Sequence, residues 1–335
     1  TYGSKTADGS QMLFSLLAAE DARYRTAAIR NLEYLRTMIK NGVIGSGPQF
    51  FEMSKTPPCN YPTFARAKNL AMAVELGDQS SGELAPLPSD QPGMFRSYPS
   101  VNIVVARTAH VMATISGYQY VDQMNWGQGR YSQFPAGGSA CNIWFKDYGL
   151  LQTSSPVRYV RGEVIHMPEI TEPIKPHTPR IEFSDSGRYY TNLYDRFGSM
   201  TATRGDDGGM HVVYSGELRN EQHLPGGVSF QYAHDIGDAF VTKTVNVKYH
   251  DRLPVIDIVD PIIWNSAMKI TQEGDRTVRI ISAGKEFEFR ILEGNARIVL
   301  GEGKELQWQP FPALRTYPII LRLAVPVDPY KTGTF

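Results

Sequence analysis

The spacing of apolar residues changes once along the chain, and this change limits the kinds of domain that can form. In residues 1–78 apolar side chains recur at the three- and four-residue spacing of a helix, as at Ala28, Leu32, Leu35 and Ile39. From residue 94 onward they alternate with polar residues, as strands with one buried face do. Helices followed only by strands predict two separate domains rather than an α/β fold.

Composition marks the boundary between these two parts. Residues 79–93 are polar and rich in Pro, Gly and Ser, which is typical of a linker. We therefore expect an all-helical segment at 1–78, a linker at 79–93 and an antiparallel β-sandwich at 94–335. The fold class is α+β and multidomain, with a short helical part resembling an incomplete toroid before a large sandwich.

Individual elements can be predicted within these parts. The second helix is expected to run through Ile39 to the Asn41-Gly42 stop, and a third to start after Pro62 with Thr63 as its N-cap. Four segments alternate clearly enough to be predicted as strands: Val101–Arg107, Met210–Leu218, Phe240–Lys248 and Ile319–Val325.

Charge and hydropathy exclude several classes of protein. The chain has 34 basic and 34 acidic side chains, so it lacks the net positive field that draws proteins to nucleic acid. No apolar run approaches the roughly 20 residues that span a bilayer. An aromatic content of 11% argues against disorder. The expected partner is therefore neither nucleic acid nor the interior of a membrane.

Common catalytic motifs are absent from the sequence, which contains no GxGxxG, GxxxxGK[ST], HExxH or GxSxG motif in the required context. Residues 110–149 are the richest in aromatic and polar side chains. Tyr118 and Tyr120 share one face of an extended segment, and residues 122–139 are predicted to form a long loop. Long loops on a rigid sheet often carry function. The alternative is that these aromatic side chains only pack against the helical part.

One pair of motifs resembles a known family. Asp147 and Gly149 form an Asp-x-Gly turn, and the segment Tyr159–His166 follows it with an aromatic residue, an Arg and a His. With the order of helices, linker and sandwich, this resembles the heparinase II/III-like polysaccharide lyases. The resemblance implies a bacterial, secreted or periplasmic protein acting on an acidic polysaccharide or oligosaccharide.

The expected activity is β-elimination on a uronic-acid-containing glycan. This reaction requires that the carboxylate be neutralised, that a base remove the C5 proton and that an acid protonate the leaving O4. Asn60 or Arg130 is predicted to neutralise the carboxylate, and Tyr61 or Tyr131 to transfer the protons. The predicted substrate-binding residues are Tyr118, Tyr120, Asn125, Trp126 and Trp144.

The resemblance also implies a metal site, but an incomplete one. Family members with zinc use the Asp of the Asp-x-Gly turn and the His of the next strand, positions taken here by Asp147 and His166. Residues 130–139 contain no His that could serve as a further ligand, whereas zinc usually has at least three protein ligands. No cofactor is therefore firmly predicted, and zinc is the metal to consider. The alternative is that Asp147 is only a turn residue and His166 only a hydrogen-bonded residue of a strand.

Two other functions stay open. One is a lyase-like protein that binds glycan without cleaving it, and the other is a glycoside hydrolase, which needs two facing carboxylates. The remaining histidines do not help to distinguish between these functions. His211 is expected to be structural, and solvated positions near loops and turns are expected for the others, namely His177, His223, His234 and His250.

Overall fold

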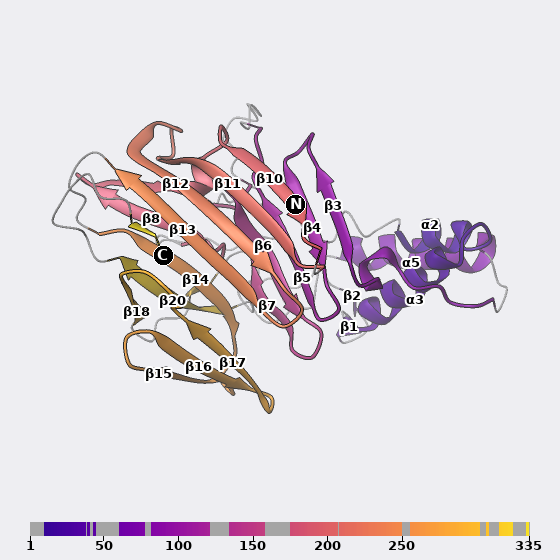
Figure 1. Ribbon diagram of the computed structural model, residues 1–335. Coiled ribbons are helices and arrows are strands. Elements are labelled where there is room, and N and C mark those ends of the chain that lie inside the picture. The colour runs from indigo at the N-terminus through magenta and orange to yellow at the C-terminus, as the bar shows by residue number, and fades with distance from the viewer. Residues whose placement is uncertain are drawn as a thin grey trace. The chain divides into compact units, whose positions relative to one another are not determined.

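The computed structural model describes residues 10–37, 39–40, 43–44, 60–77, 82–120, 134–157, 175–206, 208–249, 255–301, 306–307, 315–323 and 333–334. The described residues form two compact units, one ending at Gln91 and the other beginning at Pro92 (Figure 1). The predicted fold class is confirmed, because helices occur in the first unit and the second is built from antiparallel sheets. The finer boundaries at 78 and 93 stay a prediction.

Three α-helices make up the described core of the first unit. They are α2 (Ser10–Leu17), α3 (Ala22–Thr37) and α5 (Asn60–Leu76). Asp21 caps α3, since its Oδ1 accepts a hydrogen bond of 2.9 Å from the backbone N–H of Arg23. Leu35 packs against Leu70 and joins α3 to α5. None of the helices in the described residues is long and apolar enough to cross a membrane.

Two sequence predictions for this unit were wrong. Helix α3 ends at Thr37, and Ile39–Lys40 (β1) pairs with Val43–Ile44 (β2) instead of continuing the helix. The Asn-Gly dipeptide between these strands favours a hairpin, a signal that outweighs the helical spacing of Ile39. Helix α5 begins at Asn60 rather than after Pro62, because the first turn of a helix tolerates the missing N–H of proline.

The second unit contains a five-stranded antiparallel sheet in sequential order. Its strands are β3 (Met94–Tyr98), β4 (Ile103–Arg107), β5 (Val111–Ser116), β6 (Ser139–Phe145) and β7 (Gly149–Thr153). A separate three-stranded sheet is formed by β15 (Lys269–Glu273), β16 (Thr277–Ser282) and β17 (Lys285–Arg290).

Within the described residues, the largest sheet has eleven strands. Its main path is β18-β20-β14-β8-β9-β11-β12-β13-β21, and β10 and β19 pair at the side with β11 and β20. The strands are β8 (Arg180–Asp185), β9 (Arg188–Thr191), β10 (Ser199–Arg204), β11 (Met210–Arg219), β12 (Pro225–Ile236), β13 (Val241–Tyr249), β14 (Asp257–Trp264), β18 (Ala296–Leu300), β19 (Leu306–Gln307), β20 (Arg315–Leu323) and β21 (Gly333–Thr334). Each of the four segments predicted as strands overlaps one of the observed strands, namely β4, β11, β13 and β20.

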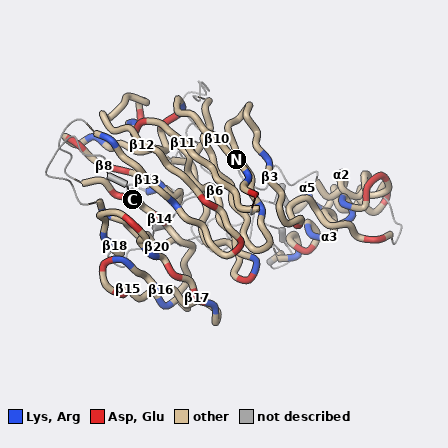
Figure 2. The backbone as a smooth tube through the Cα atoms, viewed as in Figure 1, with Lys and Arg blue, Asp and Glu red and all other residues tan. Residues whose placement is uncertain are grey.

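Alternation along the strands builds the core between the two larger sheets. On β11, Met210, Val212 and Tyr214 are buried and face the same way. Met210 and Val212 pack with Val104 and Ile115 of the five-stranded sheet. Acidic and basic residues are interspersed over the described parts of both units (Figure 2), in keeping with the balanced charge of the sequence.

Candidate functional site

An aromatic patch lies beyond the end of β5, where the chain leaves the five-stranded sheet. The ring of Tyr118 lies 5.7 Å from that of Tyr120 and 5.5 Å from that of Phe134, measured between centroids. The guanidinium carbon of Arg196 lies 5.4 Å from the Tyr118 centroid. Tyr120 and Phe134 are 50% and 42% exposed, so this cluster presents aromatic surface to solvent.

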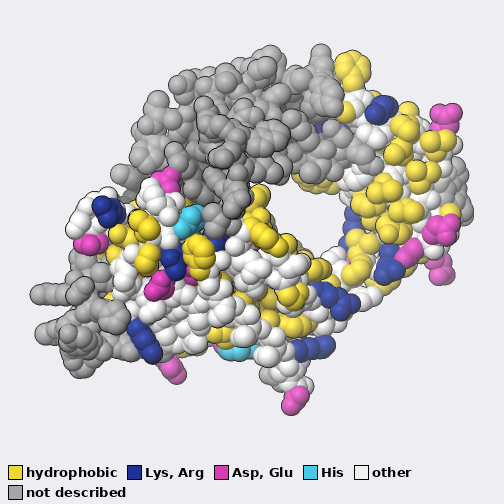
Figure 3. Space-filling view, turned by 90° about the horizontal axis from the view of Figure 1, so that it is seen from above, with side chains coloured by type: hydrophobic (Ala, Val, Ile, Leu, Met, Phe, Trp, Pro, Cys, Tyr) yellow, Lys and Arg dark blue, Asp and Glu magenta, His cyan; other side chains and the backbone are white. Residues whose placement is uncertain are grey.

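A second aromatic cluster lies between the short helix η2 (Asn192–Tyr194) and the end of β11. Phe197 is 60% exposed, and the guanidinium carbon of Arg219 lies 4.7 Å from the centroid of its ring. The ring of His223 meets Phe197 edge-on, with centroids 6.3 Å apart. We call this whole set the aromatic patch: Tyr118, Tyr120, Phe134, Arg196, Phe197, Arg219 and His223. Hydrophobic, basic and histidine side chains lie next to one another on the surface of the sandwich unit in Figure 3.

A buried carboxylate holds the Phe197 part of the patch in place. Asp195 is fully buried and accepts hydrogen bonds from Arg219 Nε at 3.0 Å and from the Tyr214 hydroxyl at 3.1 Å. It also accepts from the backbone N–H groups of Glu217 and Phe197. Gly216 permits this approach, since a Cβ there would lie only 1.8 Å from Asp195 Oδ2. The position of Arg219 beneath the Phe197 ring is therefore fixed from inside the protein.

A buried amide ties the segment before β6 to the segment after β9. Asn192 Nδ2 donates to the Gly137 carbonyl at 3.0 Å and to Ser139 Oγ at 2.9 Å, and its Oδ1 accepts from the Ile181 N–H. Gly137 has φ +64°, and a Cβ on it would lie 2.0 Å from the Asn192 carbonyl oxygen. These contacts join the segment that follows Phe134 to the segment that precedes Phe197.

Tyr214, although it contacts Asp195, is suited to donating a hydrogen bond rather than accepting a proton. Burial, together with the neighbouring Asp195 carboxylate, raises the pKa of its phenol. Its hydroxyl also accepts a hydrogen bond of 3.0 Å from the Gly198 N–H. Tyr214 therefore supports the patch and is not a candidate base.

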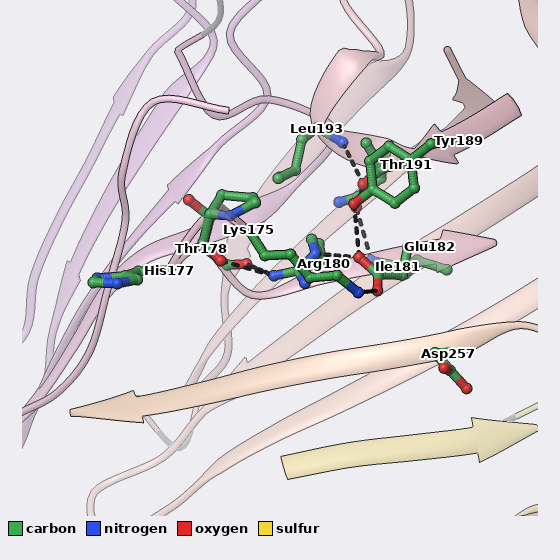
Figure 4. Close-up of polar contacts among 12 residues, drawn as sticks. Lys175, His177, Thr178, Arg180, Ile181, Glu182, Tyr189, Thr191, Leu193 and Asp257 are labelled. Atoms are coloured by element: carbon green, nitrogen blue, oxygen red, sulfur yellow. Dashed lines mark hydrogen bonds and ion pairs between the residues drawn. The ribbon is translucent and has the colours of Figure 1, made fainter. Parts of the chain in front are cut away.

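A second polar cluster lies on β8 and β9 and contains a buried ion pair (Figure 4). Arg180 is fully buried and pairs through Nε with Glu182, while its Nη1 donates to the Pro176 carbonyl at 2.9 Å. Tyr189 donates to Glu182 at 2.7 Å. Burial alone would raise the pKa of Glu182, but the adjacent Arg180 guanidinium holds it at about 2. The arrangement is that of a structural ion pair.

A third cluster is enclosed between the sheets. Lys243 forms an ion pair with Asp260 and donates to Gln152 Oε1 at 2.8 Å. His234, beside them, donates from Nε2 to the Gly138 carbonyl at 2.7 Å. Burial, reinforced by the positive charge of Lys243, lowers the pKa of His234 to about 3. The imidazole is therefore neutral at pH 7.

The solvated positions expected for His177 and His234 were wrong, and His250 lies outside the described residues. His234 and His177 are both fully buried, and His223 is partly buried. The signal for His234 was present in the sequence, because it continues the alternation of Phe230 and Tyr232 along β12. His211 does lie on a strand, where its Nδ1 is 2.5 Å from Asp235 Oδ1.

The structure brings together some of the predicted substrate-binding residues and separates another. Tyr118 and Tyr120 are in contact within the aromatic patch. Trp144 lies on β6 opposite Met112, with the guanidinium carbon of Arg107 at 4.6 Å from its ring centroid. Met112 precedes Tyr118 by six positions, which corresponds to up to about 20 Å along an extended chain. Trp144 thus lies toward the other end of this sheet.

The remaining predicted site residues are only partly described. Asp147 is exposed in the turn between β6 and β7, whereas His166 lies outside the described residues. No group of three His, Cys, Asp or Glu side chains among the described residues could hold a metal ion. Asn60 and Tyr61 open α5, but their side chains are outside the description, as are four whole residues: Asn125, Trp126, Arg130 and Tyr131.

Sequence reasoning did not find Phe197 and Arg219. Phe197 follows a short 3-10 helix and Arg219 ends a strand, so no periodicity links them. The buried Asp195 brings them together. The only local signal in the sequence was a Phe directly after an Asp-Arg pair, and this signal was too weak to predict a binding residue.

Comparison with known proteins gives matches over nearly the whole chain. Residues 95–331 match the family model described as the ulvan lyase C-terminal domain, and residues 1–88 match the ulvan lyase N-terminal domain. A broad-specificity ulvan lyase of Formosa agariphila is 24% identical over 334 residues, covering 98% of this chain and 49% of that protein. The chain therefore spans about half the length of this curated relative.

Among solved structures, the chondroitin AC lyase of Streptomyces coelicolor A3 in complex with chondroitin sulphate is similar to this chain. Its TM-score is 0.40 at 13% sequence identity, and the match covers 100% of this chain and 51% of that chain. The family matches confirm the predicted resemblance at the level of a polysaccharide lyase family.

Proposed function

We propose that this chain, which belongs to the ulvan lyase family, is part of a polysaccharide lyase that cleaves a uronic-acid-containing glycan by β-elimination. The observation that carries the proposal is the family match over residues 95–331, since that range contains the whole aromatic patch. The relative in Formosa agariphila is itself described as a broad-specificity ulvan lyase.

The chemistry of the patch supports glycan binding. Exposed aromatic rings offer apolar faces on which sugar rings can stack, and Phe197, Tyr120 and Phe134 provide such rings. Guanidinium groups suit carboxylate-bearing ligands, and Arg219, whose side chain is 15% exposed, lies against the Phe197 ring. Arg196 is buried and supports the Tyr118 ring instead. The patch thus offers exposed aromatic rings and one partly exposed guanidinium, which is paired with Asp195 and Glu217.

The catalytic roles predicted from the sequence form part of this proposal. Asn60 or Arg130 would neutralise the substrate carboxylate, and Tyr61 or Tyr131 would transfer protons. Asn125, Trp126 and Trp144 would extend substrate binding beyond Tyr118 and Tyr120. The finer grouping with heparinase II/III-like lyases, their toroid and a secreted or periplasmic location rests on the Asp147 turn motif and the order of the parts.

A second candidate function is glycan binding without cleavage. The observation that favours it is a departure from the family pattern, since residues 130–139 lack the upstream histidine and only Asp147 and His166 match the zinc ligands. The two functions differ in their products, which makes them easy to separate.

The test of the proposed function compares substrates with and without carboxylates. We expect the natural full-length protein to produce ultraviolet-absorbing unsaturated uronides from a uronic-acid polysaccharide. The same polysaccharide after chemical reduction of its carboxyl groups should give none, because the C5 proton is then no longer acidic. Absence of absorbance on every uronic polysaccharide, with binding retained, would favour the binding protein.

Replacement of Phe197 by Ala is expected to weaken polysaccharide binding by about 1–2 kcal/mol, or roughly tenfold in Kd, through loss of one aromatic platform. Phe240→Ala is the matched control, since Phe240 is similarly exposed at 57% but lies in the turn before β13, outside the patch. Affinity electrophoresis or calorimetry would measure the effect. Equal losses for both variants would show that the patch does not bind the polysaccharide.

A further inference from the structure

His223 closes the turn that joins β11 to β12. Its backbone N–H donates to the Asn220 carbonyl at 2.8 Å. Asn220 also accepts, through Oδ1, from the N–H groups of Gln222 and Leu224 at 3.0 Å each. The turn is therefore built by its own hydrogen bonds, and the imidazole is not needed to form it.

The backbone of His223 adopts a conformation that favours glycine. Its φ is +62°, in the left-handed region, where a side chain with a Cβ is disfavoured. The other described non-glycine residues with positive φ have smaller side chains, and they are Asn102, Ser186 and Ala283. A non-glycine residue at positive φ motivates a functional hypothesis. Here that residue carries an imidazole.

The tautomer of the imidazole follows from its hydrogen bond. Nδ1 of His223 lies 2.7 Å from the carbonyl oxygen of Tyr194. Since a carbonyl only accepts, the proton of the neutral ring is on Nδ1, and Nε2 carries a lone pair. No described residue forms a hydrogen bond with Nε2. The ring is thus oriented as a base would be, with Nε2 not engaged by any residue in the described part of the chain.

Aromatic rings and charged groups hold this orientation. The rings of Tyr194 and Phe197 both meet the imidazole edge-on, each with centroids 6.3 Å away. Arg219 Nη1 donates to the His223 carbonyl at 2.9 Å, and Arg219 is itself paired with Asp195 and Glu217. Glu221 lies in the same turn.

We propose that Nε2 of His223 removes the C5 proton of a uronic acid residue stacked on Phe197. This inference rests on the proposed function and assigns the base to His223 in place of Tyr61 or Tyr131, with water as the acid. The nitrogen lone pair takes the proton, and the C5–H electron pair forms the C4=C5 double bond. The C4–O4 bond breaks, its electron pair leaves on O4, and O4 takes a proton from water. His223 is returned to its neutral form when the imidazolium releases its proton to solvent.

Three variants of the natural full-length protein separate a catalytic role from a structural one. His223→Asn keeps a residue that tolerates positive φ and can still donate to the Tyr194 carbonyl. His223→Gly relieves the backbone and removes the imidazole. His110→Asn is the matched control, since His110 is exposed in the turn between β4 and β5 and lies outside the patch.

We expect kcat to fall by about 10²–10⁴-fold in His223→Asn and His223→Gly, the usual contribution of a proton-transferring side chain, with KM little changed. The melting temperature of His223→Gly should equal or exceed that of the wild type. Added imidazole should restore part of its turnover. His110→Asn should match the wild type.

The possible failures can be told apart. A wild type that eliminates no uronic polysaccharide overturns the proposed function itself. An active wild type whose His223→Gly variant keeps its kcat overturns only the assignment of His223. The assignment also fails if His223→Gly loses both melting temperature and activity while His223→Asn keeps full activity, because the imidazole would then be merely structural.

Discussion

Replacement of Glu182 by Gln is expected to lower the free energy of unfolding of the sandwich unit by about 3–5 kcal/mol, the usual cost of breaking a buried ion pair from one side. Arg180 is fully buried and keeps its charge, and its Nε would lose the carboxylate with which it pairs. The hydrogen bond from Tyr189 would lose its charged acceptor as well. Urea denaturation followed by tryptophan fluorescence would measure the change.

An exposed ion pair of the same kind supplies the control. Arg290 pairs with Glu288 across two positions of β17, much as Arg180 pairs with Glu182 on β8, but the Arg290 side chain is 60% exposed. Glu288→Gln should therefore cost less than about 1 kcal/mol. If the two substitutions proved equally mild, the Arg180–Glu182 pair would not be the buried structural element described above.

Acid should destabilise the protein well above the pH at which most carboxylates titrate. The pKa of His234 is lowered from 6.5 to about 3 in the folded protein, chiefly by burial and then by Lys243. Between about pH 6.5 and pH 3, His234 is therefore protonated in the unfolded chain but neutral in the folded protein. The free energy of unfolding falls as pH is lowered through this range. At about 1.36 kcal/mol per pH unit, the loss at pH 4 from this residue is roughly 3 kcal/mol.

His234→Gln tests this directly. Glutamine can still donate to the Gly138 carbonyl, which His234 Nε2 does at 2.7 Å, but it does not titrate. The variant should lose about 3 kcal/mol less than the wild type between pH 7 and pH 4, whatever its stability at neutral pH. Parallel pH dependences for the two proteins would contradict a buried neutral His234.

The division of the chain into helices and then antiparallel strands could be predicted, because both depend on local spacing of apolar residues. The errors have local causes as well. Ile39 fits a helical period, but the adjacent Asn-Gly dipeptide favours the β1–β2 hairpin. Strand β12 was not predicted, although it alternates buried and exposed residues and places His234 on its buried face.

The candidate site was harder to predict, because its parts are far apart in the sequence. Tyr118 and Tyr120 could be placed on one face from their spacing, and they are in contact. Arg196 contacts Tyr118, and the adjacent buried Asp195 pairs with Arg219, which packs against Phe197. Such contacts depend on how the two sheets stack, and no pattern within a single segment encodes them.

The mass of the reaction products tests the central claim most directly. The natural full-length protein is incubated with a uronic-acid polysaccharide, and the new non-reducing ends are analysed by mass spectrometry. The account predicts end groups lighter than the corresponding hydrolysis products by one water molecule, because β-elimination leaves a C4=C5 double bond. Products that carry the added water would identify a glycoside hydrolase instead, and an unchanged polysaccharide would contradict enzymatic cleavage altogether.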